Sequence, residues 1–306
     1  AEYVYGDTDS VFFTFNLMEV DGTPIRGQRA LELTILLAQD AGVLASSFLK
    51  GPHDLEYEKT FMPFCLLSKK RYVGMLYETD PHKCYRKSMG IVLKRRDNAP
   101  IVKDVYGGVI DILMRGDGMP KAISFTEECL DQLVKKQVPI NKLVITKSLR
   151  SGYKNPQQIA HKVLADRIGV REPGNKPAPG SRIAFAYIVN PTAKKQGEKI
   201  ETPEYIDRAK CKLDYGHYIT NQIMKPLSQV LGLCIEELPQ FARRKQGFLD
   251  RVEQLRAACG DDHAKSREAE QKLRDGEVKR LFFDQFIKAA DRLKNHQRDL
   301  PSMFGF

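Results

Sequence analysis

Two aspartates one residue apart, Asp7 and Asp9, stand between two apolar, aromatic stretches of the chain. These stretches, residues 2–5 and 11–15, have the composition of β-strands, and Gly6 suits the turn between them. We therefore expect both carboxylates at the tip of a β-hairpin. Because Mg²⁺ takes oxygen ligands and tolerates few protein ones, a pair of acids on a rigid tip suits that cation.

Taken alone, an Asp-x-Asp pair is more often a turn or capping feature than a metal site. An EF-hand loop is excluded, because Val11 stands where the third ligand would be. The wider sequence context favours a functional role for the pair. The segment with Glu56 and Glu58 and the run Lys69-Lys70-Arg71-Tyr72 follow downstream. Each has a simpler interpretation, a solvated face for the acids and a solvated turn for the basic run.

The composition is that of a soluble globular protein. The chain has 306 residues, 42% of them hydrophobic and 29% charged. The most apolar stretch, residues 31–49, is interrupted by Glu32, Gln39 and Asp40, so we expect no membrane partner. No Walker loop, dinucleotide fingerprint or serine-hydrolase motif is present.

The cysteines indicate a reducing environment. All six are scattered, and none forms a C-x-x-C pair. The pattern predicts neither zinc nor an iron–sulfur cluster, and it favours an intracellular, reducing compartment.

The charge points to a polyanionic partner. The net charge is +10 and the pI is about 9.2. Between Leu67 and Lys103 basic residues far outnumber acidic ones, so the excess forms a patch of the kind that phosphate contacts require. A merely basic soluble enzyme is the alternative.

Hydrophobic periodicity predicts an α+β fold. We expect a partial antiparallel sheet with a helix on one face, then a mainly helical region and a helical tail. The expected strands are residues 2–5, 11–15, 54–61, 64–67, 72–77, 90–93, 143–146 and 182–189, and the expected helices are residues 24–49, 101–114, 124–136, 156–168, 215–233 and much of 238–295.

Six segments together resemble a known family. They are Tyr5-Gly6-Asp7-Thr8-Asp9-Ser10, Leu55-Glu56-Tyr57-Glu58-Lys59, Leu67-Ser68-Lys69-Lys70-Arg71-Tyr72, Arg95-Arg96-Asp97-Asn98-Ala99-Pro100, Leu143-Val144-Ile145-Thr146-Lys147 and Lys225-Pro226-Leu227. Over roughly residues 1–235 their order and spacing resemble the C-terminal half of the polymerase region of a family B DNA polymerase. The delta-like group and its large-DNA-virus relatives are the most similar.

Two departures from the delta pattern point to the viral branch. Nuclear delta subunits end in two cysteine clusters, which this sequence lacks, and they have Glu-Thr/Ser-Val where this chain has Val92-Leu93-Lys94.

The resemblance implies a domain order and an activity. Residues 1–97 would be the later part of the polymerase palm, 98–237 the thumb, and 238–306 a helical extension. The parent enzyme would be a DNA-directed DNA polymerase, a nucleotidyltransferase of DNA replication. It would add deoxynucleotides to a primer 3′ end with two Mg²⁺ ions, so its partners would be primer–template DNA and deoxynucleoside triphosphates. It would work in the nucleus or at a viral replication site.

By the same resemblance, Asp9 would ligate both Mg²⁺ ions and Asp7 would support the site more loosely. Glu58 would stand beside the metals in an accessory role. The family's second metal-binding carboxylate comes from a segment upstream of these motifs, so we expect the fragment alone to be inactive.

The basic motifs would grip DNA. Lys69, Lys70 and Arg71 would contact the primer–template duplex, with Tyr72 behind the primer terminus. Lys94, Arg95 and Arg96 would hold the duplex backbone, a contact that is independent of sequence.

The last ten residues resemble a sliding-clamp-binding peptide, and its elements are Gln297, Leu300, Met303, Phe304 and Phe306. A frayed, weakly packed tail is the alternative.

A rival function is a non-catalytic duplex-DNA-binding module derived from a polymerase. Because inactive relatives often lose such acids, the presence of Asp7 and Asp9 favours catalysis in the parent protein.

Overall fold

The structure is a computed structural model that describes residues 1–94, 97–260 and 262–295, without the side chain of Lys94. It divides into two compact units, residues 1–91 and 92–306. The first combines small antiparallel sheets with one long helix, and the second is mainly helical. The predicted α+β class is therefore confirmed.

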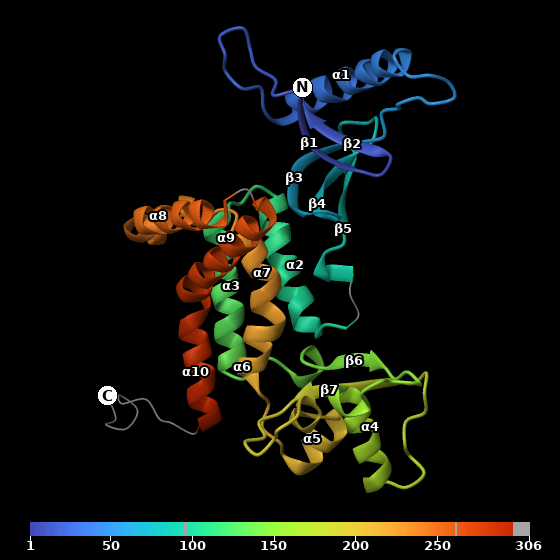
Figure 1. Ribbon diagram of the computed structural model, residues 1–306, viewed down its shortest axis with the longest axis vertical. Coiled ribbons are helices and arrows are strands. Elements are labelled where there is room, and N and C mark those ends of the chain that lie inside the picture. Colours follow the sequence, from blue (N-terminus) through green and yellow to red (C-terminus); the bar gives the residue numbers. More distant parts are fainter. Residues whose placement is uncertain (95–96, 261, 296–306) are drawn as a thin grey trace. The chain divides into compact units, whose positions relative to one another are not determined.

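The predicted hairpin is present in the first unit (Figure 1). Strands β1 (Glu2–Asp7) and β2 (Ser10–Thr14) pair antiparallel, with Asp7 opposite Ser10. A separate antiparallel sheet has the order β3 (Thr60–Ser68), β4 (Arg71–Tyr77) and β5 (Cys84–Met89). The turn between β3 and β4 is the Lys69-Lys70 pair.

Helix α1 (Gly27–Ser47) contacts β3 and buries Leu31 and Ile35. It ends close to the predicted boundary, because Gly51-Pro52 cannot continue a helix. By length and composition alone α1 could cross a membrane, although the core helix of a soluble protein passes the same test. The expectation of no membrane partner stays a prediction.

Two predicted strands are wrong. The predicted strand 54–61 is present only at its last two residues, which begin β3; residues 54–59 alternate between exposed and half-buried side chains as predicted, but they form no regular secondary structure and pair with no described strand. Ser46 on α1 holds this segment instead, since its hydroxyl accepts the Leu55 N–H at 2.8 Å. Residues 90–93 follow the last strand of the sheet, and Val92–Lys94 forms a 3₁₀ turn.

The second unit joins a helical part to a small sheet. Up to residue 231 its helices are α2 (Pro100–Met114), α3 (Met119–Val134), α4 (Ala160–Arg171), α5 (Pro203–Ala209), α6 (Tyr215–His217) and α7 (Met224–Leu231), and its strands β6 (Ile145–Ser148), β7 (Arg182–Tyr187) and β8 (Ile200–Glu201) pair in that order. The buried Tyr218 ties the two parts together. Its hydroxyl donates to the Leu143 carbonyl at 2.7 Å and accepts the Tyr187 N–H at 2.9 Å.

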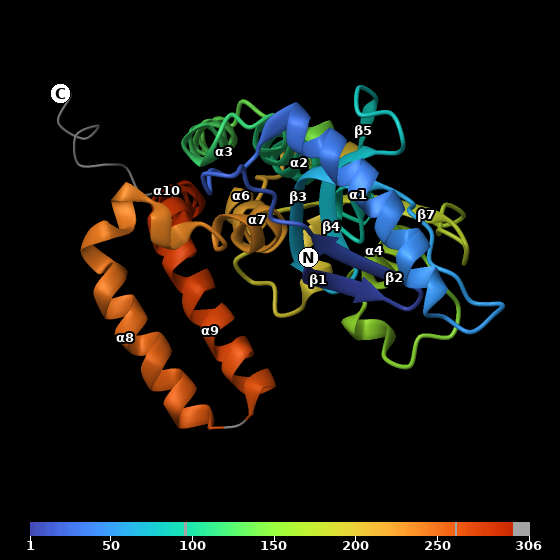
Figure 2. The ribbon, with the colours of Figure 1, turned by 90° about the horizontal axis from the view of Figure 1, so that it is seen from above.

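The predicted helical tail is also present. Helices α8 (Ala242–Cys259) and α9 (His263–Val278) form an antiparallel hairpin, which Figure 2 shows from above. A π-helical turn leads into α10 (Asp284–Asn295), which packs against α3 and α6. Glu277 on α9 is buried and pairs with Arg244 on α8 at 2.6 Å. Because an unpaired buried carboxylate is costly, loss of this ion pair would destabilise the contact between α8 and α9.

Candidate catalytic hairpin and nucleic-acid interface

The two aspartates at the tip of the β1–β2 hairpin differ in how exposed their side chains are. Thr8 and Asp9 form the turn, and Thr8 adopts a left-handed φ of 59°. The Asp9 N–H and the Ser10 hydroxyl both donate to the Asp7 carbonyl, at 2.8 and 3.1 Å. These bonds fix the turn. The Asp9 side chain is left exposed, whereas the Asp7 side chain is partly covered.

Lys70 binds the partly covered aspartate. Its Nζ lies 2.6 Å from Oδ1 and 2.9 Å from Oδ2 of Asp7. The hydrogen bond from Lys70 lowers the pKa of the Asp7 carboxyl, and Asp7 in turn raises the pKa of the Lys70 ammonium. Both groups are therefore charged at neutral pH. A predicted metal-binding residue and a predicted DNA-binding residue, 63 positions apart, meet in one ion pair.

Three features hold Lys70 in this position. Its backbone N–H donates to the Tyr5 hydroxyl at 2.9 Å, so β1 supports the turn directly. Lys70 itself has a φ of 61°. A Cβ on Gly90 would lie only 2.1 Å from the Lys70 carbonyl oxygen, so the chain can pass behind the turn only at a glycine.

Aromatic rings pack beneath the turn. Tyr72 is 9% exposed, and its ring lies among those of Tyr5, Phe12, Phe61 and Phe64, with centroids 5.3 to 6.4 Å apart. Such a cluster stabilises the hairpin against the β3–β4–β5 sheet. The expected place of Tyr72 behind a primer terminus stays a prediction.

The hairpin fits a hard cation in part. Within the described residues, no hydrogen bond or ion pair occupies the Asp9 carboxylate, which is free to act as an oxygen ligand. Asp7 could act as a second oxygen ligand only if its ion pair with Lys70 were broken. In the part of the chain that the structure describes, no group of three or more metal-ligating side chains comes together. Further ligands would have to come from elsewhere.

The predicted accessory acid Glu58 and the nearby Glu56 lie on the segment between α1 and β3. The Glu58 side chain is 70% exposed and pairs with its neighbour Lys59. Glu56 is exposed as well. Across the described ranges no hydrogen bond or ion pair joins Glu58 to Asp7 or Asp9. Its accessory role stays a prediction.

Of the remaining predicted DNA contacts, Lys69 and Arg71 flank Lys70 and are exposed. Arg95, Arg96 and the side chain of Lys94 lie outside the described residues, as does the predicted clamp-binding segment with Gln297, Leu300, Met303, Phe304 and Phe306.

Sequence reasoning missed two residues of the site, Tyr5 and Gly90. Tyr5 was identified only as part of a motif, although its hydroxyl holds Lys70. The sequence around Gly90 contains no signal for its role, because the close approach to Lys70 arises from pairing between β4 and β5.

Comparison with known proteins gives a consistent family match. The family model for DNA polymerase family B matches residues 1–234. Most of the described hairpin, sheet and helical region therefore lies inside the matched span. Residues 235–306 lie beyond it.

Viral and nuclear polymerases are among the similar curated proteins. The DNA polymerase of Pyramimonas orientalis virus is 44% identical over 310 residues, covering 99% of this chain and 25% of that protein. The DNA polymerase of Acanthamoeba polyphaga mimivirus is 46% identical over 242 residues, covering 77% of this chain and 14% of that protein. The DNA polymerase delta catalytic subunit of Candida albicans is 34% identical over 231 residues, covering 75% of this chain and 21% of that protein. The chain thus spans a quarter or less of the length of these relatives.

Proposed function

The chain belongs to DNA polymerase family B, and from this premise we propose that it is part of a DNA-directed DNA polymerase that extends a primer 3′ end on a template. The observation that carries the proposal is the ion pair between Asp7 and Lys70. It brings the acidic hairpin and the basic turn together, as a site that acts on a nucleic-acid end requires.

Asp9 is the residue that we propose to hold Mg²⁺, because its exposed carboxylate fits an oxygen-seeking cation. When bound, two Mg²⁺ ions would supply activation of the 3′-hydroxyl and neutralisation of the triphosphate. Since the chain spans a quarter or less of its relatives, we propose that the second metal-binding carboxylate lies in another part of a longer polypeptide. The fragment alone would then be inactive.

Asp7 and Lys70 would act by position and charge. The lowered pKa of Asp7 keeps it ionised, so it holds the Lys70 ammonium at the hairpin tip. A lysine held there can donate to the duplex while Lys69 and Arg71, exposed on either side, attract its phosphates. Glu58 would add negative charge at the edge of the site.

The remaining assignments follow from the family. We propose that residues 1–97 belong to the palm, 98–237 to the thumb and 238–306 to a helical extension. Deoxynucleoside triphosphates and primer–template DNA would be the substrates, and a sliding clamp would bind the segment from Gln297 to Phe306. The nucleus or a viral replication site, both reducing, would be the place of action.

A primer-extension assay tests the proposal. The full-length polypeptide should extend a primer with Mg²⁺ present and should stop wherever the one nucleotide complementary to the template is omitted. Duplex binding without template-directed extension would instead show a non-catalytic DNA-binding module.

A further inference from the structure

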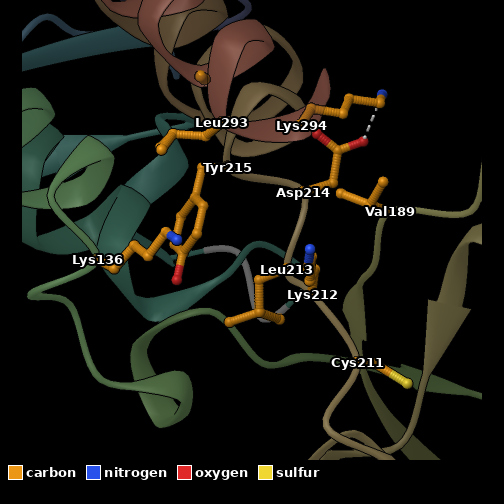
Figure 3. A pocket seen from close by; sticks show the side chains of 10 residues that line it. Lys136, Val189, Cys211, Lys212, Leu213, Asp214, Tyr215, Leu293 and Lys294 are labelled. Atoms are coloured by element: carbon orange, nitrogen blue, oxygen red, sulfur yellow. Dashed lines mark hydrogen bonds and ion pairs between the residues drawn. The ribbon is translucent and has the colours of Figure 1, made fainter. Parts of the chain in front are cut away.

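A cavity in the second unit lies where α10 meets the segment before α6 (Figure 3). Its volume is about 230 Å³. The lining comes from residues that follow α3 and β7, from the segment before α6 with the first residue of that helix, and from the C-terminal half of α10. Because α10 lies beyond residues 1–234, the region that matches the family model forms this cavity only in part.

The lining of the cavity is cationic. Three lysines contribute positive charge, Lys136, Lys212 and Lys294. Among the described lining residues Asp214 is the one acid, which leaves a net charge of +2. Both Asp214 oxygens are engaged, since Oδ2 lies 3.2 Å from the Lys294 ammonium and Oδ1 accepts the His217 N–H at 3.0 Å. The acid therefore holds one lysine in place, and two lysines remain in excess over it.

Two polar groups of the lining can donate to a ligand. Within the described ranges the Lys136 ammonium has no hydrogen-bond or ion-pair partner, whereas its neighbour Lys135 pairs with Asp131 at 2.6 Å and does not line the cavity. The Tyr215 hydroxyl also has no hydrogen-bond partner among the described residues. Burial raises the pKa of Tyr215, so its hydroxyl stays protonated at neutral pH and can act as a donor.

Much of the remaining lining is apolar. Leu213 packs against the core that contains Ile188 and Ile206, so it forms a fixed wall. Leu293 on α10 lines the cavity while its side chain is still exposed. An oxyanion alone would leave these surfaces uncovered, and an apolar molecule alone would leave the lysines without a counter-charge. The lining therefore suits a ligand that has both an oxyanion and an apolar body.

The size of the cavity limits the ligand further. Sites for drug-sized molecules have volumes of roughly 300 to 1,000 Å³, so this cavity suits a smaller molecule. A nucleic-acid backbone is a poor match, because its phosphates carry no compact apolar body that could cover Leu213 and Leu293.

We propose that the cavity binds a small organic anion, with a carboxylate or phosphate head among the lysines and a compact apolar body against Leu213 and Leu293. Lys136 and Tyr215 would donate to the oxyanion, and Lys212 would add positive charge. Because such a ligand would contact both α10 and the segment before α6, it would also stabilise the packing between them. The proposal does not depend on the polymerase function, since it uses no catalytic or DNA-binding assignment.

Fluorine NMR on the full-length polypeptide tests the proposal with defined probes. The anions 4-fluorophenyl phosphate and 4-fluorobenzoate carry the same ring with the two head groups, 4-fluorobenzyl alcohol carries the ring without charge, and inorganic phosphate, measured by competition, carries charge without the ring. At least one ring-bearing anion should bind saturably and at least about tenfold more tightly than either the alcohol or inorganic phosphate. The tighter of the two anions identifies the head group.

Single substitutions locate the bound probe. Lys136→Gln should weaken binding of the ring-bearing anion at least about tenfold, because a charged donor is lost. Lys136→Arg keeps the charge and should retain most of the affinity. Lys135→Gln, next to it but outside the lining, is the matched control and should leave the affinity unchanged. Leu293→Ser should weaken the ring-bearing anion several-fold but not inorganic phosphate, because only apolar contact is removed.

Three results would overturn the proposal. The first is the absence of saturable binding by both ring-bearing anions, and the second is an equal effect of Lys136→Gln and Lys135→Gln. The third is displacement of the bound probe by a primer–template duplex, which would assign the lysines to DNA. Primer extension tests the polymerase function separately, so failure of one proposal leaves the other standing.

Discussion

Gly90→Ala should displace the turn that holds Lys70 at the hairpin tip. The new Cβ would lie 2.1 Å from the Lys70 carbonyl oxygen, whereas real Cβ atoms stay beyond about 3.0 Å, so one of the two backbones has to move by roughly 1 Å. Gly90 also has a φ of +62°, which is unfavourable for alanine.

A matched glycine separates these two effects. Gly22 lies in the same unit with a φ of +84°, and nothing stands within 4 Å of its added Cβ. The left-handed conformation costs about 1 kcal/mol at either site. Forcing the overlap at Gly90 adds about 1 to 3 kcal/mol. We therefore expect a loss of about 1 kcal/mol for Gly22→Ala and about 2 to 4 kcal/mol for Gly90→Ala.

Urea unfolding of the chain, followed by tyrosine fluorescence, measures the difference. Primer extension by the full-length polypeptide provides the functional comparison. Gly90→Ala should slow extension because Lys70 leaves Asp7, and Gly22→Ala should not. If the two variants lose equal stability and extend primers equally, the packing of Gly90 against Lys70 does not position the site.

Three further predictions concern single side chains. Lys70→Ala should raise the pKa of Asp7 toward its ordinary value, because the hydrogen bond that lowers it is gone; carboxyl-carbon NMR titration would show this, and an unchanged pKa would contradict the ion pair. Tyr218→Phe should cost about 2 to 3 kcal/mol, since one buried and one partly buried backbone group lose their partner, whereas Tyr215→Phe, with no such bonds in the described structure, should cost less in the same urea unfolding assay. Burial lowers the pKa of His217 to about 4, so the unfolded chain takes up the proton first as the pH falls. Stability should therefore drop by about 3 kcal/mol between roughly pH 6.5 and 4, and a decline of the same size in His217→Gln would refute that assignment.

Structural features that depend on residues close together in the chain could be predicted from local sequence patterns. The hairpin was predictable because two aromatic stretches flank a short polar turn, and α1 because its apolar spacing ends at Gly51-Pro52. The predicted strand at residues 54–61 had the right alternation of exposure, but pairing needs a partner, and Ser46 on α1 provides the hydrogen bonds there instead. Periodicity cannot distinguish an extended segment from a paired strand.

Contacts between residues far apart in the chain could not be predicted from the sequence. Both Asp7 and Lys70 were predicted site residues, yet nothing in their spacing indicates that they form an ion pair. β5 was missed because Cys84–Met89 is mostly exposed and polar, so it lacks the alternation of a half-buried strand.

Single-turnover primer extension at saturating DNA tests the central claim most directly. The full-length polypeptide with Asp9→Asn should lose at least about a thousandfold in rate while binding the duplex normally, since a lost metal ligand affects only the chemical step. Asp7→Asn should lose less, because Asp7 positions Lys70. An Asp9→Asn variant that extends primers at the wild-type rate would contradict the assignment of the hairpin as the catalytic centre.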